Sequence, residues 1–152
     1  MIQRIQSVYL FVSLCFMLPM FFLPVAELLL KTGEIFTFNF TGFYLNEAGV
    51  TTRINTQWSI LLFGMLICAL NFIIIFLYKS RVLQIRLSIY NILFLIGLTG
   101  IIIFTAYNVQ NVETVSFRLP IVFPVIAVIL HYLAFRAIRK DEIMVQALNR
   151  LR

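Results

Sequence analysis

Charged residues are scarce in this chain, with 12 lysines and arginines and 6 acids among 152 residues. There is a single histidine, and the two cysteines, Cys15 and Cys68, lack the spacing of a zinc or redox motif. The sequence contains no recognisable catalytic, nucleotide-binding or metal-binding motif, so we expect no catalytic residues, no cofactor and no metal. We interpret the cysteines as small apolar side chains rather than as a disulfide.

Apolar residues fill the place of the missing charges. They make up 62% of the chain, and the mean hydropathy is +1.00. A soluble domain of this size could not cover so much apolar surface with polar residues. The composition therefore predicts a single membrane domain over residues 1–152.

The two longest uncharged runs predict a transmembrane helical hairpin. WSILLFGMLICALNFIIIFLY and LSIYNILFLIGLTGIIIFTAY each have 21 residues, which is enough to cross a hydrocarbon core of about 30 Å at about 1.5 Å per residue. The segment between them, KSRVLQIR, is basic. We predict helices over 57–78 and 87–107 with their turn in the cytoplasm.

Two further spans are predicted, over 5–30 and 119–136. Pro19 and Pro24 should bend the first of these helices rather than end it. The last helix meets neither proline nor glycine after residue 125 and should continue as a cytoplasmic helix over 137–152. The predicted fold class is an all-α membrane protein, a four-helix transmembrane bundle.

The loop over 31–56 is the longest connection. Its phenylalanines at 36, 38 and 40 alternate with polar residues, which is typical of a strand with one apolar face. The sequence NEAG can form a turn that returns VTTRI along this strand. We predict a small extracytoplasmic β-hairpin. It is either a cap that docks a partner or gates the bundle, or a lid that only shields the outer mouth of the bundle.

The basic residues are distributed unevenly about the predicted spans, although the net charge is only +6. Nine cations fall on the side of the hairpin turn and three on the other side, which follows the positive-inside rule and places both termini in the cytoplasm. This distribution indicates membrane topology, with attraction to anionic lipids, rather than nucleic-acid binding. The nine are Arg4, Lys79, Arg81, Arg86, Arg136, Arg139, Lys140, Arg150 and Arg152.

Polar and small residues inside the hairpin suggest how it packs. Asn71 and Asn91 lie at similar distances from the turn, so we expect their amides to hydrogen-bond across it. Gly64 lies near the level of Gly97 and Gly100, where the backbones could approach closely. The alternative is that the two asparagines line a polar path, because intramembrane polar groups often mark one.

His131 and the basic start of the tail are expected at the membrane surface, and the rest of the tail either projects into the cytoplasm or lies on the membrane. His131 precedes Arg136 by about one turn and is expected at the interface. Arg136, Arg139 and Lys140 should lie at headgroup depth. Beyond them, an apolar stripe is expected to contact lipid or a partner protein, and it includes Met144, Leu148 and Leu151.

The opening MIQRIQSVYLF and the tail FRAIRKDE…LNRLR resemble a family of small bacterial proteins with four predicted membrane spans, one of the catalogued domains of unknown function. The resemblance covers essentially the whole chain. It implies a multi-pass protein of the bacterial cytoplasmic (inner) membrane and implies no activity. It also suggests a shared cytoplasmic face, formed by Gln3, Arg4, Arg136, Arg139, Lys140, Asp141 and Glu142.

Three functions remain open. The first is a non-enzymatic structural or accessory subunit that binds another membrane protein or a second copy of itself. The second is a small transporter or channel with Asn71, Asn91 and His131 near the path. The third is a membrane enzyme, for which Ser88 and His131 are the only nucleophile and base predicted at one level. We favour the first, because all six acids fall outside the apolar core and ion coupling normally needs ionisable groups there.

Overall fold

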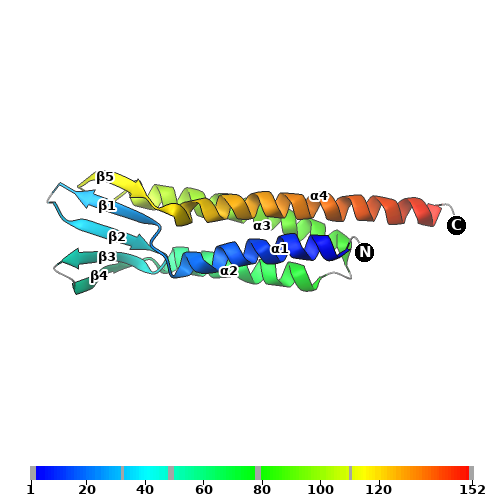
Figure 1. Ribbon diagram of the computed structural model, residues 1–152, viewed down its shortest axis with the longest axis horizontal. Helices are drawn as coiled ribbons and strands as arrows, with labels where there is room; N and C mark the ends of the chain where they lie inside the picture. Colours follow the sequence, from blue (N-terminus) through cyan, green and yellow to red (C-terminus); the bar gives the residue numbers. More distant parts are fainter. Residues whose placement is uncertain (1–2, 32, 48–49, 78–79, 110, 151–152) are drawn as a thin grey trace.

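Four helices form an elongated bundle that carries a β-sheet at one end (Figure 1). The computed structural model describes residues 3–31, 33–47, 50–77, 80–109 and 111–150. Each helix packs on the next along the chain, and α4 also packs extensively on α1, which closes an antiparallel ring. We call the end that holds both termini the terminal end, and the opposite end the sheet end. The helices are α1 (Gln3–Met17), α2 (Trp58–Phe76), α3 (Arg81–Tyr107) and α4 (Phe123–Arg150).

Three helical segments are long and apolar enough to cross a membrane, namely Trp58–Phe76, Arg81–Tyr107 and Leu119–Val145, and Ile5–Phe21 is a shorter apolar helix. The chain is therefore a mostly helical, multi-pass membrane protein. The expected continuity of the last helix through Arg136 is confirmed, since α4 runs unbroken to Arg150. The third helix starts at Arg81 rather than at residue 87, so the basic segment is mostly helical.

The predicted first span over 5–30 is too long. Helix α1 ends at Met17 and passes into a 3-10 turn, η1 (Leu18–Phe21), with Pro19 in its first turn. A proline there has no N–H to continue the α-helical bonding, and Pro24 follows within five residues. The chain then leaves the bundle and forms strand β1 (Ala26–Leu30).

The sheet has five strands rather than the two of the predicted hairpin, so the all-α assignment is wrong. Strand β1 is joined by β2 (Ile35–Asn39), β3 (Gly42–Glu47), β4 (Val50–Thr56) and β5 (Val112–Phe117), in the antiparallel order β4-β3-β2-β1-β5. The phenylalanine-rich run is not one strand, because it turns between Asn39 and Gly42. A Cβ at Gly42 would lie 1.9 Å from the carbonyl oxygen of Asn55, and the φ of +144° also favours glycine.

Strands from two distant connections pair at the edge of this sheet. Strand β1 belongs to the connection between α1 and α2, whereas β5 belongs to the connection between α3 and α4. Ala26 pairs with Phe117 and Leu29 with Thr114. The Arg118 guanidinium also forms an ion pair with Glu27, a residue within the predicted first span over 5–30. These contacts join the two connections, and we call them the β1–β5 junction.

The apolar core lies where the sheet meets the helices. Phe38 and Phe43 stack with their ring centroids 4.6 Å apart. Phe40 is buried against Gly64 of α2, and its ring centroid lies 5.1 Å from that of Phe21. The core continues into the bundle through aliphatic side chains such as Leu98. The sheet therefore rests on the helix ends through packed aromatic rings.

Candidate functional site

The buried side chains recur at intervals of three and four residues on every helix, and their character changes along the bundle. Near the sheet end they are apolar, whereas the half toward the terminal end contains a set of buried polar groups, which we call the polar layer. Its members are Gln6 and Ser13 on α1, Asn71 on α2, Gln84, Ser88 and Asn91 on α3, and His131 and Asp141 on α4. Polar groups in this position must find partners within the protein, because lipid offers none.

His131 and Asn91 bond to one another across the α3–α4 contact. Asn91 Nδ2 lies 3.0 Å from His131 Nε2, and both side chains are fully buried. An amide nitrogen is only a donor, so Nε2 accepts and the ring proton lies on Nδ1. His131 is therefore buried inside the bundle, whereas its depth in the membrane stays a prediction. Burial follows from its position on the inward stripe of α4, between Ala127 and Ala134.

Asn71 bonds to α1 instead of to Asn91. Its Nδ2 donates to Ser13 Oγ at 2.6 Å, and both groups are buried. The predicted hydrogen bond between Asn71 and Asn91 is wrong, since each amide nitrogen contacts a different helix. Distance from the turn fixes depth but not rotation, and each residue along a helix turns a side chain by about 100°.

At the terminal end of the polar layer, side chains of α3 form hydrogen bonds and an ion pair. Gln84 Nε2 donates to the carbonyl of Ile74 at 3.2 Å, and Ser88 donates to the carbonyl of Gln84 at 2.8 Å. Arg81 and Asp141 face one another with 3.9 Å between Nη1 and Oδ2. These contacts tie the start of α3 to the end of α2 and to α4.

Four buried atoms of the polar layer have no hydrogen-bond partner within the described part of the protein: Gln6 Nε2, Asn71 Oδ1, Asn91 Oδ1 and His131 Nδ1. An unpaired buried polar atom costs about 1–3 kcal/mol. The four comprise two acceptors, one amide donor and one ring N–H, a set suited to water or to a small uncharged polar group. No group of three possible metal ligands occurs among the described residues.

The glycines do not form the predicted close contact between α2 and α3. A Cβ at Gly64 would lie 2.6 Å from the ring of Phe40, so Gly64 admits that ring rather than a helix backbone. Among the described residues, a Cβ at Gly97 would meet only the ring of Phe63, at 3.9 Å. A Cβ at Gly100 would meet nothing within 4 Å. The close approach expected at Gly97 and Gly100 is wrong, because these glycines lie on the exposed side of α3.

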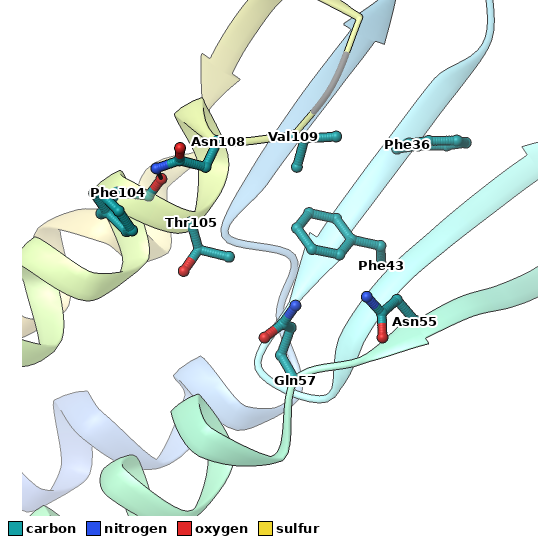
Figure 2. A pocket seen from close by; sticks show the side chains of 8 residues that line it. All are labelled: Phe36, Phe43, Asn55, Gln57, Phe104, Thr105, Asn108 and Val109. Atoms are coloured by element: carbon teal, nitrogen blue, oxygen red, sulfur yellow. Dashed lines mark hydrogen bonds between the residues drawn. The ribbon is translucent and has the colours of Figure 1, made fainter.

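A cleft of about 440 Å³ opens between the sheet and the end of α3 (Figure 2). Strands β2 and β3 contribute aromatic rings, and Phe104 extends from α3 on the other side. The described lining residues carry no charge, so the cleft suits an uncharged and partly apolar group. They are Phe36, Phe43, Asn55, Gln57, Phe104, Thr105, Asn108 and Val109.

The predicted lipid or partner residues lie on α4. Arg136, Arg139 and Lys140 are exposed, and Met144 is 39% exposed. Leu148 belongs to the helix, but its side chain lies outside the described residues, as does all of Leu151. Both cysteines are free thiols, as the sequence suggested.

Sequence reasoning missed several members of the polar layer, especially Gln6, Ser13 and Gln84. The signal was their spacing, because Gln84, Ser88 and Asn91 follow one another at intervals of four and three. In helices that are apolar all round, the hydrophobic pattern does not identify the inward face, whereas the polar residues do.

One family matches the chain almost from end to end. Its description is "Domain of unknown function (DUF4293)", and the match covers residues 2–151. The chain therefore belongs to this family. A comparison with curated proteins gives no match.

Proposed function

We propose that this DUF4293 protein is a non-enzymatic accessory subunit of the bacterial cytoplasmic membrane, which binds another membrane protein through the free end of α4. The observation that supports the proposal is a run of exposed apolar side chains beyond the bundle. Ile143, Met144 and Val145 are 58%, 39% and 38% exposed. Three consecutive helical residues point about 100° apart, so about half of the circumference of the helix is uncovered here.

Lipid does not account for this exposure as readily as it does within the bundle. Arg136 and Lys140 are exposed cations that suit headgroup depth. Met144 lies four residues, about 6 Å, beyond Lys140 along the helix. Apolar side chains in that position leave the hydrocarbon and need a protein surface to cover them. In Figure 1, α4 extends past the end of α1.

The proposed orientation places the terminal end in the cytoplasm. Nine of the twelve cations fall on that side in the sequence, which supports the orientation by the positive-inside rule. The sheet and its cleft then face the extracytoplasmic side, and both termini are cytoplasmic.

Purification in mild detergent after crosslinking in cells tests the proposal. Met144→Glu and Leu148→Glu should abolish recovery of a reproducible partner without reducing the amount of protein in the membrane. Val82→Glu is a matched control, because Val82 is exposed to 51% at the start of α3, on the terminal side. Unchanged recovery with both tail variants would remove α4 from the interface, and the cleft in Figure 2 would become the next surface to test.

A small transporter or channel is the second candidate. The four unpartnered atoms of the polar layer support it, because they could bind water or a polar solute along a path. The test places a cysteine at Ser88, which is fully buried, in a variant lacking Cys15 and Cys68. Reaction with a small, charged thiol reagent in intact membranes would favour a hydrated path. Protection from the reagent would favour the accessory subunit.

A further inference from the structure

A groove of about 410 Å³ runs between α1 and α4 at the terminal end of the bundle. Ile5 and Tyr9 line it from α1, while α4 contributes Leu133, Arg136, Ala137 and Lys140. The apolar side chains and the cations are separated along α4. Leu133 lies seven residues before Lys140, which places it about 10 Å closer to the middle of the bundle.

Neither cation of the groove belongs to an ion pair that is defined between described residues. The defined pairs Arg81–Asp141 and Arg118–Glu27 involve neither Arg136 nor Lys140. The hollow at the sheet end gives a useful contrast. It is lined by Arg118 among apolar side chains, but that arginine already has a carboxylate partner. An anion is therefore favoured in the groove and not in the hollow.

We infer that the α1–α4 groove binds an anionic phospholipid. The phosphate lies between Arg136 and Lys140, and the first part of an acyl chain follows the wall formed by Leu133 and Tyr9. Basic pockets between transmembrane helices are suited to such headgroups, because guanidinium and ammonium groups bind phosphate while the helices offer an apolar wall. The separation of cations from apolar residues along α4 matches the division of a phospholipid into headgroup and chain.

A second hollow of about 360 Å³ adjoins the groove on α4 and shares Arg136 and Lys140 with it. It adds Arg139 together with the apolar parts of Tyr132 and Phe135, which precede Arg136 along α4 and lie nearer the middle of the bundle. The groove and this hollow therefore give the cations an apolar surface on each side. One acyl chain of the lipid can lie in the groove and the other in the hollow. This site does not depend on the accessory function proposed above.

Native mass spectrometry of the full-length protein tests the inference. The protein is reconstituted with equal amounts of phosphatidylglycerol and phosphatidylcholine with identical chains, then released, and the retained lipids are counted. The wild type should retain phosphatidylglycerol preferentially. Each cation contributes about 1 kcal/mol near an anionic surface, so Arg136→Gln and Lys140→Gln should each lower the preference about fivefold.

The control removes two charges elsewhere, which is twice the loss in either single variant. Lys31→Gln with Arg86→Gln replaces two exposed cations outside the groove, and this variant should keep the wild-type preference. Ala137→Trp, which fills the groove without changing charge, should lower the total lipid retained. Equal retention of both lipids by the wild type would overturn the inference, as would an equal loss in the control or full retention in Ala137→Trp.

Discussion

His131 of α4 accepts a hydrogen bond from Asn91 of α3, with 3.0 Å between Nε2 and Nδ2. A separate bond joins Asn71 of α2 to Ser13 of α1. Each bond therefore joins two helices that follow one another in the chain. The polar layer therefore has one bond within the hairpin of α1 and α2 and another within the hairpin of α3 and α4. These take the place of the single amide pair predicted between α2 and α3.

The first prediction concerns the coupling between Asn91 and His131. Replacing both by alanine should cost less than the sum of the single losses, by about 0.6–1.7 kcal/mol, as measured for hydrogen bonds between transmembrane helices. Unfolding in mixed detergent micelles with increasing dodecyl sulfate measures these free energies. Strictly additive losses would contradict the bond.

The second prediction separates Asn71 from Asn91. Asn71→Ala should couple to Ser13→Ala, because these two side chains share a bond. The losses in the free energy of unfolding caused by Asn71→Ala and Asn91→Ala should add to within about 0.5 kcal/mol, as they do for independent sites. The same unfolding measurement serves for both pairs, and strong coupling between the two asparagines would restore the contact expected from the sequence.

The third prediction compares two glycines in apolar helices. Gly64→Ala places a methyl group 2.6 Å from the ring of Phe40, which is buried and packs at a tilt against Phe21. Such overpacking costs about 1–3 kcal/mol. Gly100→Ala meets nothing within 4 Å and should leave stability unchanged or raise it by up to about 1 kcal/mol through helix propensity. Equal effects at the two positions would show that Phe40 does not contact α2.

The three long helices were predictable because uncharged runs of about 20 residues satisfy both the length and the composition of a membrane span. Strand β1 was not predictable in the same way. Its sequence, AELLL, is apolar enough to extend a helix, and only the preceding prolines argued against it. Strand β5 was not predictable either, because it is an edge strand with most of its side chains exposed, so no buried face produces an alternating pattern.

The polar layer was only partly predictable, for a different reason. The sequence gives the depth of Asn71 and Asn91, because depth depends on distance along a helix. Their partners depend on how each helix is rotated about its axis and on which helices are neighbours. Ser13 and His131 come from α1 and α4, and no local pattern places those helices against the hairpin.

The fourth prediction tests orientation. In a variant without Cys15 and Cys68, a cysteine at Thr114, an exposed position of β5, should react with an impermeant maleimide added to the outside of cells. A cysteine at Arg139 should react only after the membrane is opened. The opposite pattern would invert the proposed topology and place the sheet in the cytoplasm.

The β1–β5 junction has a mechanical consequence for the bundle. The pairing of Ala26 with Phe117 closes the sheet end, because it joins the connection between α1 and α2 to the connection between α3 and α4. At the terminal end the chain itself joins α2 to α3, and Gln84 Nε2 of α3 donates a hydrogen bond to the carbonyl of Ile74 of α2. The two hairpins are therefore linked at both ends of the bundle, which opposes any pivoting of one hairpin away from the other about the sheet.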